Sequence, residues 1–187
     1  TGGVEALSKI VAALPGGLPP IVIVQHMPPR FTASFAQRMN ALGPVRVREA
    51  EDRMVLEPGQ AVIAPGGFQL EILRQGDRYR TRIFSGSVVS GHAPSVDVMF
   101  HSVAAVAGAQ AVGVILTGMG HDGAEGLLAL HETGAITLGQ DQASALVYGM
   151  PRVAREMGAV GTEVALEKMA GAIVRAVEVA AREKLAS

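Results

Sequence analysis

Short apolar runs alternate along the chain with segments whose apolar residues recur at helical spacing. The runs at residues 21–24, 111–116 and 135–139 are nearly free of polar side chains, which is typical of strands buried on both faces of a parallel sheet. Residues 45–49 and 61–64 predict two further strands. This alternation predicts an α/β fold: a doubly wound, mainly parallel sheet with helices on both faces.

The periodic segments predict the helices between these strands. Apolar spacing marks helices at residues 4–14, 96–103, 124–131 and 165–185. Thr32 is placed to cap a helix that reaches about residue 42, and Pro151 suits the first turn of a helix that ends before Gly158. Residues 69–74 and 79–84 flank Gly76 and Asp77, which predicts an antiparallel hairpin at the rim of the sheet.

Composition restricts the functions to be considered. The chain has 187 residues, a net charge of −1 and no cysteine, so we expect one domain over residues 1–187, with no thiol catalysis, disulfide or cysteine-based zinc site. The charge balance gives no reason to expect nucleic acid as a partner. Because no apolar run is long enough for a bilayer and no signal peptide is recognisable, we expect a cytoplasmic protein without membrane insertion.

A glycine-rich loop at residues 117–123 follows the apolar run at 111–116 and ends with Asp122 and Gly123. Ligands of open α/β sheets gather at the carboxyl ends of the strands, where Asp122 is expected to lie. Its alternative role is to cap the helix that follows. The loop lacks the lysine of a P-loop and the GxGxxG spacing, so a nucleotide site is poorly supported and no cofactor is expected.

Two histidines are candidates for chemistry. His26 directly follows the apolar run at 21–24, at a second carboxyl strand end, and His92 lies in a loop before a predicted helix. A lone histidine beside a strand is commonly structural, so both interpretations stay open at this point. His121 and His131 lack the i, i+4 spacing of a helical metal pair, and no metal site is expected.

The first residues are unusual for an α/β chain. Thr1, Gly2 and Gly3 lead directly into a helical pattern, whereas a glycine turn that opens a helix normally follows a strand. We therefore expect that the sequence is cut just before its first helix.

Several motifs in order resemble the bacterial chemotaxis protein-glutamate methylesterases, the CheB family, and specifically their C-terminal catalytic domain. The resemblance covers essentially the whole chain. Its motifs read TGG at 1–3, QHMPPRFTASFAQRMN at 25–40, IAPGG at 63–67, HAPSVDVMFHSVA at 92–104, ILTGMGHDGA at 115–124 and SALVYGMPRVA at 144–154. The resemblance implies a Ser-His-Asp hydrolase that removes methyl esters from glutamate side chains of chemoreceptors and deamidates receptor glutamines. It implies methylated cytoplasmic receptor helices as partners, and a receiver domain that precedes this one in the parent protein.

In that resemblance the catalytic histidine is His26 and the aspartate is Asp122, while the family's serine falls immediately before Thr1. The chemistry agrees, because a hydroxyl needs a base to attack an ester carbonyl. His26 would take the proton and return it to the leaving methoxide, and Asp122 would orient the imidazole. The backbone N–H of Met119, with Thr1, would stabilise the oxyanion.

Two arginines and two alternatives complete the predictions. Arg30 and Arg152 lie near the expected active edge and would dock an acidic receptor segment, although both also suit a solvated surface. Arg53 stands where the family often has glycine, which indicates a surface change. The alternatives are an N-terminal nucleophile hydrolase that uses Thr1 and a non-catalytic binding module of the same fold.

Overall fold

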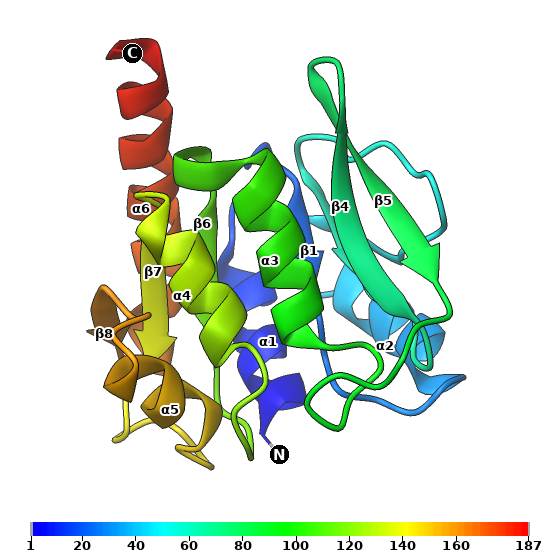
Figure 1. The fold of residues 1–187 in the computed structure, drawn as a ribbon, viewed down its shortest axis with the longest axis horizontal. Coiled ribbons are helices and arrows are strands. Elements are labelled where there is room, and N and C mark those ends of the chain that lie inside the picture. Colours follow the sequence, from blue (N-terminus) through cyan, green and yellow to red (C-terminus); the bar gives the residue numbers. More distant parts are fainter. Residues whose placement is uncertain (1, 187) are drawn as a thin grey trace.

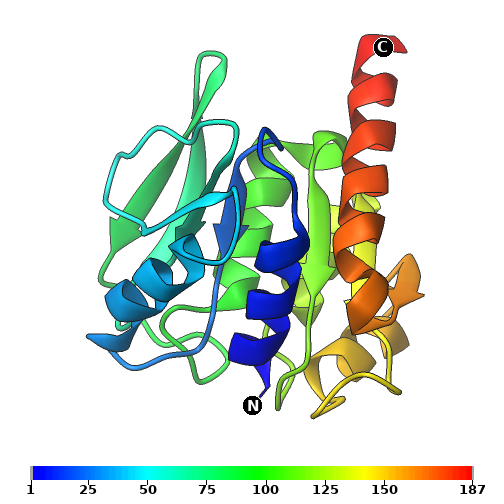
Figure 2. The same cartoon turned by 180° about the vertical axis from the view of Figure 1, so that it is seen from behind.

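Helices cover both faces of a parallel β-sheet in the computed structural model, which describes residues 2–186 (Figure 1). Helices α3 (Val96–Val106) and α4 (Ala124–Glu132) lie on one face, and Figure 2 shows α1 (Gly3–Ala13) and α6 (Leu166–Ala186) on the other. The remaining helices are α2 (Phe31–Asn40), α5 (Met150–Glu156) and the short 3₁₀ helix η1 (Gly108–Gln110). The predicted doubly wound α/β class is confirmed.

The parallel strands form two hydrogen-bonded halves. One half has the order β1-β3-β2 and the other β6-β7-β8. Their bounds are β1 (Ile21–Ile23), β2 (Arg46–Glu49), β3 (Gln60–Ile63), β6 (Val112–Ile115), β7 (Ile136–Gln140) and β8 (Thr162–Val164). The sequence pattern did not predict β8, because this short, largely exposed strand contains no apolar run.

Two apolar clusters fill the space between the sheet and its helices. Met39 and Met169, which are fully buried, belong to the cluster on the side of α1, α2 and α6. Leu127 and Leu130 of α4 belong to the cluster on the opposite side. Burial of these side chains fixes the helices against the sheet and so holds the strand ends in register. None of the helices within residues 2–186 is long and apolar enough to cross a membrane.

The predicted hairpin is formed by β4 (Gln69–Gln75) and β5 (Arg78–Phe84), which pair in antiparallel register. Gly76 in its turn has φ +64°, a conformation that favours glycine. Leu70 and Ile72 are buried, and the Ile72 N–H donates to Ser102 Oγ of α3 at 2.9 Å. The hairpin therefore packs beside α3 at the rim of the sheet.

The prediction that Thr32 caps a helix was wrong. Helix α2 begins at Phe31, and its N-cap residue is Arg30, with φ +79°, two residues before Thr32. The Thr32 side chain is buried, donates to a carboxylate oxygen of Glu49 and accepts the Gly66 N–H at 3.2 Å. These partners, distant in sequence, take the hydroxyl away from the helix terminus.

Candidate functional site

His26 and Asp122 meet at the carboxyl ends of two parallel strands. His26 follows β1 and Asp122 follows β6, and the helices on both faces bring these ends to the same edge. His26 Nε2 lies 2.6 Å from Asp122 Oδ2. The imidazole is 22% exposed and the carboxylate is fully buried. The structure thus joins two groups 96 residues apart into one hydrogen-bonded pair.

The carboxylate of Asp122 is held by the start of α3. Its Oδ1 accepts from Ser95 Oγ at 2.7 Å and from the Asp97 N–H at 3.1 Å, and its Oδ2 accepts from the Val96 N–H at 2.8 Å. The expected alternative, that Asp122 caps the helix after it, is not what the structure shows. Helix α4 begins after Gly123 without a side-chain cap, and Asp122 instead satisfies amides at the N-terminus of α3.

A second carboxylate, on α3, binds the start of α4 in the same way as Asp122 binds the start of α3. Asp97 is buried, and its Oδ1 accepts the Gly126 N–H in the first turn of α4 at 2.7 Å. A Cβ on Gly126 would lie 2.8 Å from the Asp97 carbonyl oxygen, so glycine allows the two helices to approach. This exchange fixes the loop that carries Asp122 relative to α3.

The hydrogen bonds determine the charge of Asp122. Burial by itself would raise its pKa, but the bonds from His26, Ser95 and the amides of Val96 and Asp97 together outweigh burial. The pKa of Asp122 therefore lies below its ordinary value of 3.8. The group is a carboxylate at neutral pH and accepts a hydrogen bond from the protonated nitrogen of the His26 ring.

His92 lies in the same site, stacked on His26. The ring centroids are 3.6 Å apart and the planes differ by 7°. The His92 backbone exchanges both hydrogen bonds with Val89, and its carbonyl accepts from Gln69 Nε2 at 3.1 Å. Burial, followed by the neighbouring charge of His26, lowers the pKa of His92 below 6.5. His26 and His92, which the sequence offered as two separate candidates for chemistry, therefore form one stacked pair.

The glycine loop after β6 is held by backbone hydrogen bonds to the segment that leads into α5. The Gly118 N–H donates to the Val147 carbonyl at 3.1 Å, and the Gly118 carbonyl accepts the Met150 N–H at 2.8 Å. Met119, at the tip of the loop, is 76% exposed. Within residues 2–186, no hydrogen bond of the Met119 N–H is found.

The first described residues lie between the ends of β1 and β6. Gly2 has φ +80°, and a Cβ there would lie 3.3 Å from Thr117 Cγ2. A Cβ on Gly3 would lie 2.4 Å from Gln25 Oε1. Helix α1 therefore begins beside Gln25, which precedes His26, and Thr117, the first residue of the glycine loop. Thr1, which was expected to assist the oxyanion, lies outside the described residues.

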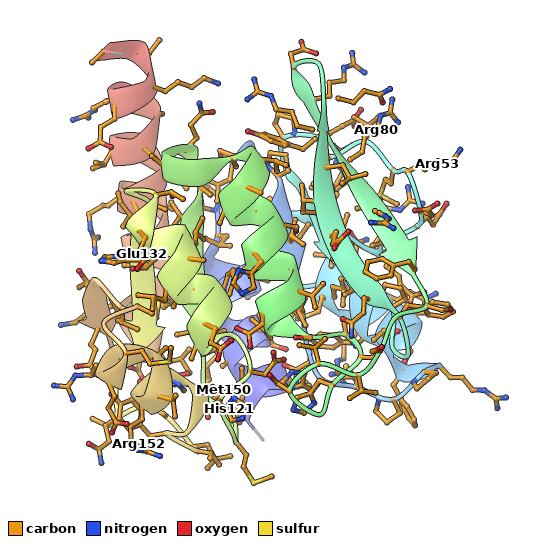
Figure 3. The ribbon with its side chains drawn as sticks, in the orientation of Figure 1. Arg53, Arg80, His121, Glu132, Met150 and Arg152 are labelled. Carbon is orange, nitrogen blue, oxygen red and sulfur yellow. The ribbon has the colours of Figure 1, made fainter. Side chains whose placement is uncertain are left out.

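The two predicted docking arginines are not in contact with the histidine–aspartate pair in any hydrogen bond or ion pair found in residues 2–186. Arg30 is exposed, before α2. Arg152 of α5 pairs with Glu156 at 2.9 Å, and Figure 3 shows it at the same end of the molecule as His121. His131 has a structural partner, because its Nδ1 lies 2.8 Å from Thr137 Oγ1.

The donor atoms of His26, His92 and Asp122 lie within 4.8 Å of one another, close enough to raise the question of a metal ion. The geometry fits an ion poorly. Both carboxylate oxygens already accept two hydrogen bonds each, which fills their lone pairs. The lone pair of a ring nitrogen lies in the plane of its ring. Because the two rings are stacked and nearly parallel, their lone pairs do not converge on one ion. The arrangement suits acid–base chemistry.

Sequence reasoning missed the role of Ser95. Its hydroxyl accepts the Val98 N–H as the N-cap of α3 and donates to Asp122. A serine after Pro94 at the start of a helix signals a cap. Nothing in the sequence reveals the second bond, because Asp122 lies 27 residues further along the chain.

Fold and site together define a doubly wound α/β protein with a hydrogen-bonded histidine–carboxylate pair at the carboxyl ends of its parallel strands. The family model described as CheB methylesterase matches residues 1–173, and the chain belongs to this family. It is 55% identical over 175 residues to protein-glutamate methylesterase/protein-glutamine glutaminase 1 of Caulobacter vibrioides, covering 93% of this chain and 51% of that protein. The corresponding protein of Syntrophotalea carbinolica is 52% identical over 174 residues, covering 93% and 49%.

The solved structures agree with the fold. The catalytic domain of the CheB methylesterase of Thermotoga maritima superposes with a TM-score of 0.90 at 33% identity, covering 95% of this chain and 93% of that one. The chain spans about half the length of the curated relatives that it matches.

Proposed function

We propose that the intact protein hydrolyses methyl esters of glutamate side chains on chemoreceptors and deamidates receptor glutamines. The observation that carries this proposal is the 2.6 Å bond between His26 and Asp122, whose carboxylate is buried and held by three further donors. The names of the relatives support the substrate class. The nucleophile is a serine directly before residue 1, as the resemblance to the family implies.

The steps follow from the positions of the groups. Because His26 Nε2 donates to Asp122, Nδ1 is the nitrogen that takes the serine proton as its oxygen attacks the ester carbonyl carbon. The Met119 N–H stabilises the oxyanion, and loss of such a donor costs about 3 kcal/mol of barrier. Collapse of the intermediate breaks the bond to methoxide, which leaves as methanol with the proton from His26.

Water completes the cycle. It attacks the resulting acyl ester while His26 takes its proton, and the serine leaves with that proton as the glutamate carboxylate is released. A glutamine substrate follows the same route with ammonia as the leaving group. Asp122 stays ionised throughout and stabilises the imidazolium.

The receptor segment contacts the edge around this pair. We propose that Arg30 and Arg152 lie along its path and attract its carboxylates, and that the segment is a methylated cytoplasmic helix of a chemoreceptor. The paired Glu156 reduces the free charge of Arg152, so Arg30 is the stronger candidate. A receiver domain that precedes this one in the parent protein would account for the additional length of the relatives.

The test is methanol release by the full-length protein from membranes with methylated receptors. The expected result is release that His26→Ala abolishes and that replacing the residue before Thr1 by alanine also abolishes. Release that survives His26→Ala would contradict the proposal. No release from the unchanged protein would favour a non-catalytic module, and loss only on replacing Thr1 would favour the N-terminal nucleophile.

A further inference from the structure

Two glutamine side chains are buried next to the segments that form the site. Gln69 is the first residue of β4 and Gln140 is the last residue of β7, and each is 1% exposed. Figure 1 shows these two strands on opposite sides of the helices α3 and α4. Burial of an amide is costly unless its N–H groups and its oxygen have partners. The partners of the two amides therefore show what each side chain holds in place.

Gln69 holds the segment that leads into α3. Its Nε2 donates to the His92 carbonyl at 3.1 Å, and its Oε1 accepts the Ser95 N–H at 2.9 Å. The hydroxyl of Ser95 donates to the carboxylate of Asp122. The ring of His92 stacks on that of His26. One buried amide therefore fixes the backbone of two residues that contact the histidine–aspartate pair.

Gln140 holds the start of the glycine loop. Its Oε1 accepts the Thr117 N–H at 2.8 Å, and its Nε2 donates to the Ser144 carbonyl at 2.9 Å. Three residues further on, the Val147 N–H donates to the Thr117 hydroxyl at 2.9 Å. The Val147 carbonyl accepts the Gly118 N–H at 3.1 Å. The amide of Gln140 thus ties both the glycine loop and the segment that supports it to the end of β7.

Met119 directly follows the residues that this network holds. Its side chain is 76% exposed, and within residues 2–186 its N–H has no hydrogen bond. The direction of that N–H therefore depends on the backbone before it, which Gln140 anchors at Thr117. A group that has to meet a transition state can cost about 100-fold in rate when it is misplaced by about 1 Å.

We propose that the two buried glutamines position the two halves of the site separately, Gln69 the histidine–aspartate pair and Gln140 the Met119 N–H. Both side chains act through backbone groups, so both are positioning residues. Their partners lie on different segments, those of Gln69 before α3 and those of Gln140 after β6 and β7. The consequence for catalysis rests on the proposed function, whereas the positioning itself does not.

Methionine at either position tests the effect on catalysis, because its flexible side chain fills a similar space without the amide. Gln140→Met and Gln69→Met in the full-length protein should each lower kcat by about 10- to 100-fold. KM should stay nearly unchanged, because the groups that are displaced act in the transition state. Methanol release from membranes with methylated receptors measures both constants.

Nuclear magnetic resonance of the full-length protein separates the two roles. The proton between His26 and Asp122 is assigned by the loss of its signal in His26→Ala. This signal should shift in Gln69→Met and stay in Gln140→Met. The Met119 amide is observed after labelling with ¹⁵N-methionine and is assigned with Met119→Leu. Its order parameter should fall in Gln140→Met and stay unchanged in Gln69→Met.

Thr81→Val is the matched control. Thr81 of β5 is also 1% exposed, and its hydroxyl accepts the Met54 N–H at 2.9 Å. The control should change neither kcat nor either signal. If a methionine variant does not fold, glutamate at the same position replaces it, since a protonated carboxyl can still donate and accept. The glutamate variants should change the same signals to a smaller extent.

The proposal is overturned if both glutamine variants change both signals alike, or if either variant leaves its own signal unchanged. A change of either signal in Thr81→Val would also overturn it, because the signals would then follow any buried polar group. Separate changes of the two signals with unchanged methanol release would retain the positioning and refute the proposed chemistry. The two proposals therefore fail separately.

Discussion

The imidazole of His92 lies flat against that of His26, with 3.6 Å between ring centroids and nearly parallel planes. His26 is therefore fixed from two directions, in its plane by Asp122 and across its face by His92. A ring held in this way keeps one nitrogen on the carboxylate and fixes the direction of the other, which is the orientation that our proposal requires for proton transfer.

We expect His92→Ala to lower kcat by about 2- to 12-fold, the loss corresponding to one aromatic pair, with little change in KM. His92→Phe should restore kcat to within about 3-fold, because the ring still stacks on His26. Methanol release with methylated receptor membranes measures both. Equal kcat values for the two variants would show that the stack does not position His26.

Replacement of Asp122 by asparagine should lower kcat by about 10⁴-fold, because the amide no longer fixes the tautomer or stabilises the imidazolium of His26. The matched control is Asp141→Asn, a loop aspartate that accepts from the Ser144 amide and hydroxyl after another strand of the sheet. Similar losses of kcat in both variants would indicate a general effect on folding and not a role in catalysis.

The pH dependence of stability should report on Asp122. Because its pKa is depressed in the folded state, its contribution is present above its unfolded value and lost as the pH falls through the folded value. Ser95→Ala removes one donor and should lower the free energy of unfolding by about 1.5–3 kcal/mol at pH 7, a difference that shrinks below about pH 4.

Urea unfolding between pH 7 and pH 2.5 measures this difference. Ser8→Ala removes a hydroxyl bonded to the Val4 carbonyl at 2.7 Å, without a carboxylate partner, and serves as the control. Its effect should not depend on pH. A Ser95→Ala difference that is equally constant would mean that the hydroxyl does not stabilise the ionised carboxylate.

Arg30 offers a clean test of receptor docking, because φ +79° suits glycine and Arg30→Gly removes the charge without backbone strain. We expect KM to rise several-fold with kcat unchanged. Arg53→Gly is the matched control: Arg53 also has positive φ, is exposed, and lies at the opposite end of the molecule from Arg152 in Figure 3. Identical KM values for both variants and the unchanged protein would exclude Arg30 from docking.

A methyl group should be tolerated at Gly118 in the glycine loop but not at Gly149, which packs against that loop. A Cβ at Gly149 would meet the Gly118 carbonyl oxygen at 2.6 Å. A Cβ at Gly118 would meet only side-chain atoms of Met150, the Sδ at 2.3 Å and the Cγ at 3.2 Å. Gly149→Ala should therefore lower the free energy of unfolding by about 1–3 kcal/mol and displace the Met119 amide, with loss of kcat. Gly118→Ala should cost less, and the opposite order in urea unfolding would contradict this.

Local pattern determined much of the fold. The strand after which His26 lies, the strand and glycine loop before Asp122, and the hairpin all follow from apolar runs and turn residues within about fifteen positions, so the sequence sufficed. The same reasoning failed for Thr32, whose partners Glu49 and Gly66 lie on other elements. It also failed for β8, where the short strand depends on pairing with β7 and not on its own pattern.

By itself the sequence determined most of the elements and which edge carries the candidate groups, because hydrophobic periodicity and turn chemistry act over neighbouring residues. Only the tertiary structure decided that Asp122 serves the start of α3 and that His92 stacks on His26. Those relationships join residues tens of positions apart. They depend on how buried polar groups find partners once the helices have packed, and a one-dimensional pattern does not contain that information.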